Sequence, residues 1–273
     1  MKITINDQFK GMTIEELLRH WVLPKKMIHE LRMSKALTVN SQPALFATQL
    51  HTGDVLELPV AEEHSQYKSS HRLCEVVYED DYLAVLVKPK GVKTHPNDMM
   101  ETNTLLNHAV YTLKSDYVEP IHRLDQETVG LVLVAKNPLI KKILDRMLEQ
   151  REITRTYKAK VRSLLPIKNQ TIELPIGKDK FHPNKRRVSD TGQHAVTHII
   201  SSQVLGDGVT EVELKLDTGR THQIRVHLAA IGHPVLGDPL YSDSKLRQLQ
   251  LTGYKLSFIH PFTGELVQAE LKQ

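Results

Sequence analysis

Strand-like segments that follow one another directly restrict the fold of residues 74–273 more than any other feature of the chain. Such β-branched or alternating segments occur at 84–87, 131–134, 156–161, 211–216, 255–259 and 266–271. Amphipathic helices are predicted in this part only over 138–150 and 221–231. Because strands mostly follow strands, we predict an α+β fold with a mixed, mainly antiparallel sheet rather than a doubly wound one.

The composition changes along the chain and divides it into two units. Residues 1–60 form a first, compact unit, and residues 74–273 are long enough for one large domain. The segment 61–73 between them is polar and has few large apolar residues, which is typical of a linker. We therefore expect a small N-terminal domain, a linker and a large C-terminal domain.

The first unit is predicted to be a small α/β domain with a basic helix. Thr13 and Glu16 have the spacing of a capping box at the start of one helix. A second helix is predicted over Lys25–Met33, and short strands follow at 37–40 and 54–58. Basic residues cluster around the second helix, opposed by a single glutamate: Lys25, Lys26, Arg32 and Lys35.

Composition and charge exclude several classes of protein. Lys and Arg total 36 against 32 Asp and Glu, and the net charge of +4 permits a polyanionic partner without requiring one. Cys74 is the only cysteine, which excludes a disulfide framework and a cysteine-built zinc site. Apolar runs fall far short of a membrane helix, and the start has no apolar signal-peptide core. We expect a cytoplasmic protein with no membrane partner.

Common cofactor and metal motifs are missing from the chain. It has no GxGxxG after a strand, no Walker loop, no GxSxG and no HExxH. His222 and His227 are five residues apart, a spacing that does not place them on one helical face, and no acidic cluster accompanies them. We therefore predict no metal site.

The segment His122–Gly130 places Asp125 in a turn directly before a buried strand. The simplest interpretation is a turn aspartate that is capped by Thr128 and paired with a surface arginine. Three further segments favour a functional site. Tyr157 lies on a cationic strand, the run 185–187 is strongly basic, and two arginines lie near the start of the helix at 221–231. Because cations at a helix N-terminus oppose its dipole, an anionic partner is favoured.

Together these segments resemble the RluA-type pseudouridine synthases. HRLDxxTxG at 122–130, RxYxAxV at 155–161 and TGRTHQIRVH at 218–227 occur in the family's order, with KPxG upstream and GHPxxGD downstream. The resemblance covers about residues 74–273. Residues 12–58 resemble the S-four-type RNA-binding module, named from a small-subunit ribosomal protein. Val129 stands where the family commonly has serine, and we expect a packing change rather than lost activity.

The resemblance implies that uridine in structured RNA is isomerised to pseudouridine. Asp125 corresponds to the family's catalytic aspartate, and Arg225 to its basic partner, so we predict a salt bridge between them. Tyr157 corresponds to the active-site tyrosine, which can stack on uracil and move a proton. A carboxylate, a phenol and a cation suffice for this chemistry, so no cofactor is expected.

The target base must leave its helix to react, and basic residues are the candidates for holding the RNA. Arg123 resembles the family residue that fills the vacated space or holds the backbone. The further candidates for RNA contacts are His122, Lys158, Lys185, Arg186, Arg187 and Arg220, with Lys25, Lys26, Arg32 and Lys35 of the first unit. Each of them could instead belong to a solvated basic face.

Two other functions remain open from the sequence. An RNA N-glycosidase would use Asp125 to hydrolyse the same bond and release uracil. A non-catalytic RNA chaperone would need none of the three site residues, so their presence argues against it. Both ribosomal and transfer RNA are possible substrates, with large-subunit ribosomal RNA favoured by the N-terminal module. No obligate protein partner is expected, and a monomer is the default.

Overall fold

The N-terminal unit is a four-stranded sheet with two helices. A computed structural model describes residues 1–59, 63–98, 100–162 and 170–272. The elements of this unit are β1 (Lys2–Thr4), α1 (Ile14–His20), α2 (Lys25–Ser34), β2 (Thr38–Val39), β3 (Gln42–Pro43) and β4 (Val55–Glu57). The sheet order is β1-β4-β2-β3. The predicted capping box at Thr13 and Glu16 is present, and it fixes the start of α1.

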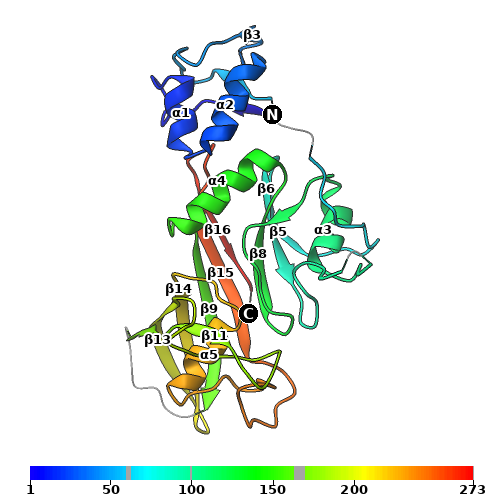
Figure 1. Ribbon diagram of the computed structural model, residues 1–273, viewed down its shortest axis with the longest axis vertical. Coiled ribbons are helices and arrows are strands. Elements are labelled where there is room, and N and C mark those ends of the chain that lie inside the picture. Colours follow the sequence, from blue (N-terminus) through cyan, green and yellow to red (C-terminus); the bar gives the residue numbers. More distant parts are fainter. Residues whose placement is uncertain (60–62, 99, 163–169, 273) are drawn as a thin grey trace.

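The large unit is built on one long, twisted sheet (Figure 1). Its strands are β5 (Val76–Glu79), β6 (Leu83–Lys88), β7 (Glu119–Pro120), β8 (Val129–Ala135), β9 (Thr154–Arg162), β10 (Gln170–Glu173), β13 (Val196–Gly206), β14 (Val209–Leu216), β15 (Leu251–Ile259) and β16 (Leu266–Glu270). The main order is β10-β13-β14-β9-β15-β8-β6-β5, with β16 paired to β15 and β7 to β8. Neighbouring strands are antiparallel except β15 and β8, which are parallel, so the predicted fold class is confirmed.

Glycines allow the parallel contact in the middle of this sheet. Gly130 of β8 lies beside Gly253 of β15, and a Cβ at Gly130 would approach the Gly253 backbone to 2.6 Å. The φ of Gly130 is +152°, a value that residues with a side chain rarely adopt. Val129, the departure from the family pattern, is half-buried at the start of β8 and pairs with Thr252. Val129 therefore lies at the parallel contact between β8 and β15.

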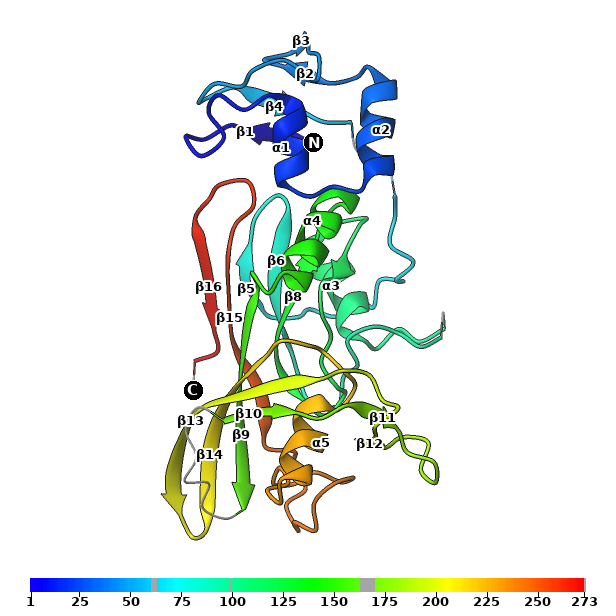
Figure 2. The ribbon, with the colours of Figure 1, turned by 60° about the vertical axis from the view of Figure 1, so that its left-hand side comes forward.

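In the described part of the large unit, three helices flank the sheet: α3 (Leu105–Leu113), α4 (Pro138–Glu149) and α5 (Gln223–Ala230). The two predicted helices agree with α4 and α5, whereas α3 was not predicted. Helix α4 buries Leu139, Ile140, Ile143 and Leu144 as expected, but Met147 rather than Leu148 completes its buried face. The small hairpin of β11 (Ile176–Lys178) and β12 (Arg186–Val188) projects from the lower part of the molecule (Figure 2).

The N-terminal unit sits at one end of the elongated molecule, on the turn between β15 and β16 (Figure 1). The indole of Trp21 donates a hydrogen bond to the Pro261 carbonyl at 3.1 Å and contacts the Phe262 ring edge-on. The amide of Asn6 donates to the carbonyls of Phe262 and Thr263. A buried, hydrogen-bonded interface therefore joins the small unit to the large one.

Residues 61 and 62 of the predicted linker lie outside the described residues. The described part of the linker packs on the large unit. Ser65 donates from its hydroxyl to the Val118 carbonyl at 2.7 Å, and the Tyr67 hydroxyl donates to the Glu119 carboxylate at 3.0 Å. Within the described ranges, no helix has the length and apolar character to cross a membrane.

Candidate active site

A pocket lies where three parts of the large unit meet. The loop before β8 supplies Asp125, strand β9 supplies Tyr157, and the start of α5 supplies Arg225. The structure therefore brings together the three residues that the sequence resemblance selected. The Asp125 side chain is 22% exposed, so its carboxylate reaches the pocket while remaining partly enclosed.

The predicted ion pair between Arg225 and Asp125 is present. Arg225 Nη1 donates to Asp125 Oδ2 at 3.2 Å, across 100 residues of sequence. The Arg225 side chain is only 4% exposed, so this partner is a buried arginine rather than the surface arginine of the simplest interpretation. Asp125 also lies 3.9 Å from His222 Nε2.

A second carboxylate holds Arg225 in place. Asp238 is fully enclosed and accepts from Arg225 Nε at 2.7 Å and from Nη2 at 2.8 Å. Its Oδ1 also accepts from the backbone N–H groups of Leu240 and Tyr241. Burial acts to lower the pKa of Arg225, but the hydrogen bonds and charge of Asp238, with a smaller effect of Asp125, raise it above its usual value. The guanidinium is therefore always charged, and its Nη1 is directed at Asp125.

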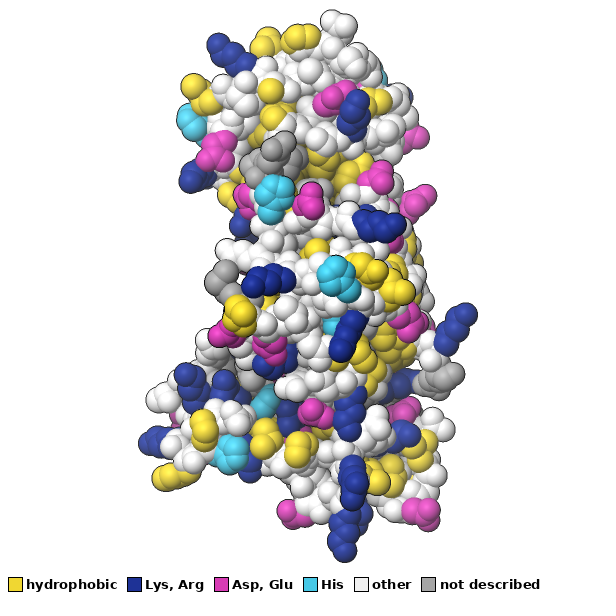
Figure 3. All heavy atoms as spheres, turned by 90° about the vertical axis from the view of Figure 1, so that its right-hand side faces the viewer, with side chains coloured by type: hydrophobic (Ala, Val, Ile, Leu, Met, Phe, Trp, Pro, Cys, Tyr) yellow, Lys and Arg dark blue, Asp and Glu magenta, His cyan; other side chains and the backbone are white. Residues whose placement is uncertain are grey.

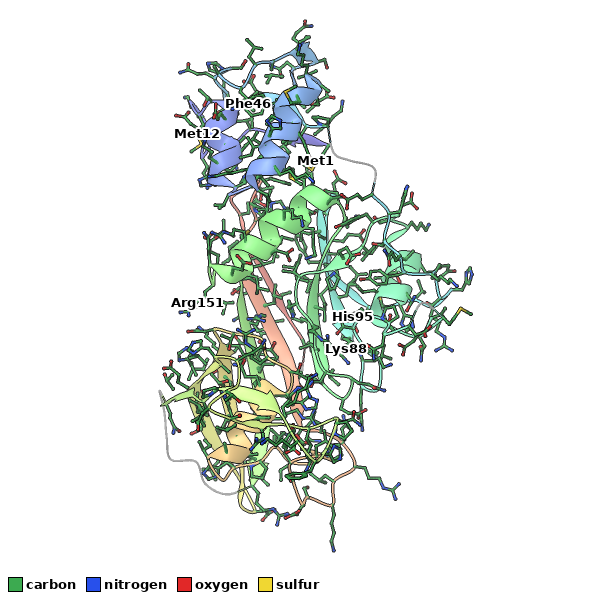
Figure 4. All side chains as sticks on the ribbon, in the orientation of Figure 1. Met1, Met12, Phe46, Lys88, His95 and Arg151 are labelled. Atoms are coloured by element: carbon green, nitrogen blue, oxygen red, sulfur yellow. The ribbon has the colours of Figure 1, made fainter. Side chains whose placement is uncertain are left out.

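The end of β6 and the segment after it hold the backbone on both sides of Asp125. The Thr94 hydroxyl donates to the Leu124 carbonyl and accepts from the Leu124 N–H. Lys88 Nζ donates to the Gln126 carbonyl at 3.0 Å and to two carbonyls of its own turn. Burial lowers the pKa of Lys88 to about 8, and the charge of Asp125 opposes that shift. Figure 4 labels Lys88 in this central part of the molecule.

Tyr157 reaches the pocket because glycine faces it on the next strand. The ring is 4% exposed, and a Cβ at Gly253 would lie 3.2 Å from it. Burial raises the pKa of the Tyr157 hydroxyl; the nearby Arg155 opposes this and Asp125 adds to it. The phenol is therefore neutral near pH 7 and keeps a proton that it can donate.

His222 links the pocket to the β11–β12 hairpin. Its backbone has φ +60°, a left-handed conformation that is costly for histidine and that tends to occur at functional sites. His222 Nδ1 lies 3.0 Å from the Tyr241 hydroxyl, which accepts a hydrogen bond from the Arg186 backbone N–H. Burial lowers the pKa of His222, while Asp125 opposes this.

The residues predicted to contact RNA occupy several places. Arg123 and Arg220 are exposed and line the pocket. Lys185, Arg186 and Arg187 lie on the projecting β11–β12 hairpin, where Figure 3 shows Lys and Arg side chains gathered on the lower part of one face. The basic residues of the first unit are exposed on or just after α2: Lys25, Lys26, Arg32 and Lys35. Arg32 pairs with Glu15 at 3.1 Å and stacks on Phe46.

Two of the predicted contacts are not brought to the open pocket. His122 is 8% exposed, and its Nε2 accepts from the Leu133 N–H. Lys158 follows Tyr157 on β9, so it points to the opposite face of the sheet. There it lies 3.8 Å from Glu211 and over the Tyr254 ring at 4.6 Å. Both side chains serve packing rather than an exposed basic surface.

The sequence reasoning missed several residues of the site. Asp238 and Lys88 belong to the GHPxxGD and KPxG motifs, but the sequence alone indicates no role for either residue. Thr94 and Tyr241 gave no signal, because their contacts join segments far apart in the chain. In the described part of the chain, no group of three or more His, Cys, Asp or Glu side chains is arranged to hold a metal ion.

Comparisons with known proteins agree with this arrangement. The model of the RNA pseudouridylate synthase family matches residues 82–230, and the model of the RluD ribosomal pseudouridine synthase N-terminal domain matches residues 1–56. The chain belongs to the RNA pseudouridylate synthase family. It is an RNA pseudouridine synthase, an isomerase, with an S-four-like N-terminal domain of the RluD type.

Individual relatives cover nearly the whole chain. The uncharacterized RNA pseudouridine synthase YhcT of Bacillus subtilis is 38% identical, over 99% of this chain and 92% of that protein. Ribosomal large subunit pseudouridine synthase D of Nitrosomonas europaea is 30% identical, over 98% and 83%. Among solved structures, human RNA pseudouridylate synthase domain containing 1 is 26% identical with a TM-score of 0.61, and the match covers 75% of this chain and 85% of that one.

Proposed function

We propose that this enzyme isomerises specific uridines of structured RNA, and that large-subunit ribosomal RNA is its substrate, with transfer RNA as the alternative. The N-terminal match to the RluD domain and the relatives named ribosomal large subunit pseudouridine synthase D support the ribosomal assignment. One observation carries the catalytic part of the proposal. The partly enclosed Asp125 is paired with the buried Arg225 in a pocket that Tyr157 lines.

The target uridine enters this pocket by leaving its helix. Asp125 lies within a recess, where a base stacked in a duplex could not reach it. Flipping the nucleotide costs a few kcal/mol of stacking and pairing, which contacts with the protein must offset. Arg123, exposed two residues before Asp125, is placed to fill the vacated space or hold the backbone.

Asp125 is the carboxylate that enables the glycosidic bond to break. The bond from ribose C1′ to uracil N1 breaks, the uracil turns, and its C5 bonds to C1′ instead. Attack at C1′, addition to the base, and proton abstraction at ribose C2′ each start from an ionised carboxylate. Arg225 pairs with this carboxylate in an enclosed site, and Asp238 fixes the direction of the guanidinium.

Tyr157 completes the isomerisation. Its ring is positioned to stack on the uracil, and its neutral hydroxyl can relay the proton: it gives its own proton to N1 or to solvent as it takes up the proton from C5. The RNA strand is held by Arg123, Arg220 and the β11–β12 hairpin, with the exposed basic residues of α2 as a second contact. His122 and Lys158 are left out of this surface because of their burial and direction.

The test is a map of pseudouridine in total RNA from cells with and without this protein, complemented by the wild type or by Asp125→Asn. We expect sites in large-subunit ribosomal RNA that return with the wild type only, because the amide lowers turnover by roughly 10⁴-fold or more. Free uracil and abasic sites would instead indicate an N-glycosidase. Full modification by Asp125→Asn would refute the aspartate-dependent mechanism.

A further inference from the structure

Arg155 is a buried arginine to which the described part of the chain provides no partner. Its side chain comes from β9, two residues before Tyr157, and the residue is 8% exposed. Neither an ion pair nor a hydrogen bond from the guanidinium is found among the described residues, and its buried Nε is unsatisfied. Because burying a charge without a partner is costly, such a residue is typical of a site that waits for an anion.

Arg155 stands in the wall between two recesses. The first is the pocket of Asp125, and the second, which we call the side recess, is lined by His95, His122 and Leu148 among others. Three arginines line both: Arg123, Arg155 and Arg220. Figure 4 labels His95 in the middle part of the molecule.

The acidic groups of the side recess are paired with other residues. Asp217 lies 3.0 Å from Arg151 and 3.0 Å from His198, and Glu149 lies 2.6 Å from Arg146. Of the wall arginines, Arg220 donates from Nε to the His194 carbonyl at 2.9 Å, which leaves its charge uncompensated. The wall therefore carries three cations that no described carboxylate neutralises.

We propose that Arg155, with Arg123 and Arg220, binds a backbone phosphate of the RNA strand next to the flipped uridine. The proposal rests on the proposed function. A nucleotide that enters the Asp125 pocket brings its own phosphodiester groups to the rim, where these guanidinium groups stand. A phosphate would supply the acceptors that Arg155 lacks, and arginine forks match phosphate oxygens in pairs.

The first test compares stability and RNA binding in Arg155→Met. The methionine removes an uncompensated buried charge and keeps much of the apolar stem, so the melting temperature of the free protein should stay equal or rise. Binding of an RNA stem-loop with uridines in its loop should weaken. The slope of log K against log salt should fall by about 0.7–0.9, which corresponds to one phosphate contact. A lower melting temperature with an unchanged slope would make Arg155 a structural residue and overturn the proposal.

Two further variants sharpen this test. Arg155→Lys retains the charge and should restore most of the salt slope. Arg151→Met is a matched control, because Arg151 is exposed and already paired with Asp217; its slope should equal that of the wild type. If the wild type itself fails to bind the stem-loop, the proposed function fails rather than the assignment of Arg155.

A scan of the phosphates locates the contact. Single methylphosphonate substitutions, which remove one backbone charge at a time, are placed around each loop uridine. One substitution should weaken binding by the wild type and leave binding by Arg155→Met unchanged. If every substitution weakens both proteins equally, Arg155 contacts no backbone phosphate.

Discussion

The charges around Asp125 differ in burial and pairing from those of the outer basic surface, by which we mean the cations of α2 and of the β11–β12 hairpin. In the pocket, Arg225 lies between two carboxylates and is almost fully buried, so each of these charges has a fixed partner. Along α2 the cations are exposed. On the β11–β12 hairpin Lys178 and Arg187 are exposed and Arg186 is half-buried, and Lys178 lies directly opposite Arg186 in the hairpin ladder. Like charges facing each other weaken a hairpin, and a bound polyanion would relieve that cost.

This difference separates two kinds of function. A buried network in which every group is satisfied fixes one geometry, and removing one member leaves another group unpaired. Exposed cations act additively through their summed field, and each contributes little to stability. Substitutions in the paired network of Asp125, Arg225 and Asp238 should therefore change turnover or folding, whereas substitutions of cations without a carboxylate partner should change RNA affinity and its salt dependence.

Apart from changes at Asp125 itself, Tyr157→Phe should have the largest effect on catalysis. The ring and its packing on Gly253 remain, but the hydroxyl that moves the C5 proton is lost. We expect kcat to fall by about 10²–10⁴-fold while the Kd for RNA stays near the wild-type value. Single-turnover kinetics and filter binding on the same RNA provide the measurement, and normal turnover would remove Tyr157 from the proton step.

Next in size is the loss of stability in Arg225→Met. This change leaves Asp238 fully buried without its cation, and the free energy of unfolding should fall by about 3–5 kcal/mol. Urea denaturation measures it. Arg123→Met, at an exposed position of the same pocket, serves as the control and should stay within about 0.5 kcal/mol of the wild type. An equal loss of unfolding free energy in the two variants would contradict the distinction between paired and exposed charges.

A smaller effect concerns the buried His122. Burial, with a contribution from Arg155, lowers its pKa to about 3, against an ordinary value near 6.5 in the unfolded chain. Between these values the unfolded chain binds a proton that the native protein does not, so stability falls as the pH decreases. From pH 6.5 to 5 this amounts to about 2 kcal/mol for one group.

We therefore expect His122→Gln to lose less stability than the wild type when the pH is lowered from 6.5 to 5. His29→Gln, at an exposed position of α2, should behave as the wild type does. Urea denaturation at both pH values gives the comparison. An identical pH dependence in His122→Gln would show that the imidazole takes up its proton at the same pH in the native and the unfolded protein.

The smallest effect is expected for the double variant Lys185→Ala and Arg187→Ala on the hairpin. Folding should be unchanged within about 0.5 kcal/mol. The slope of log K against log salt should fall by about 1.4–1.8, if each side chain contacts one phosphate. Fluorescence anisotropy of a labelled stem-loop measures it, and an unaltered slope would remove these residues from the RNA-binding surface.

The sequence predicted the parts of the fold that depend on local patterns. The helix at Thr13 and Glu16, the amphipathic α4 and most of the central strands follow from spacing and polarity alone. Helix α3 was missed because it is apolar over most of its turns and buried on several sides, so its pattern has no clear period. Strand β13 was missed because its apolar and polar residues do not alternate: Ser201, Ser202 and Gln203 follow one another, and Val204 and Leu205 at its end are exposed.

The site was predicted as far as family motifs reach. Asp125, Tyr157 and Arg225 meet because the loop before β8, strand β9 and helix α5 converge. Each of these three residues lies in a family motif, so the sequence could identify it. The burial of Asp238 and the lack of a partner for Arg155 among the described residues are features of the tertiary structure, which depend on side chains far away in sequence. For the same reason Lys158 looked like a phosphate contact, although its direction on β9 carries it to the other face of the sheet.

The attachment of the N-terminal unit through Trp21 and Asn6 has a consequence for how a target is selected. Figure 2 shows α2 and the β11–β12 hairpin on the same side of the molecule, near opposite ends. Because the small unit is docked, the distance between these two surfaces is fixed. If both surfaces contact the RNA, as proposed, a substrate must place a second helix at that distance from the uridine, and its folded architecture, as much as the bases next to the site, then decides which position is modified.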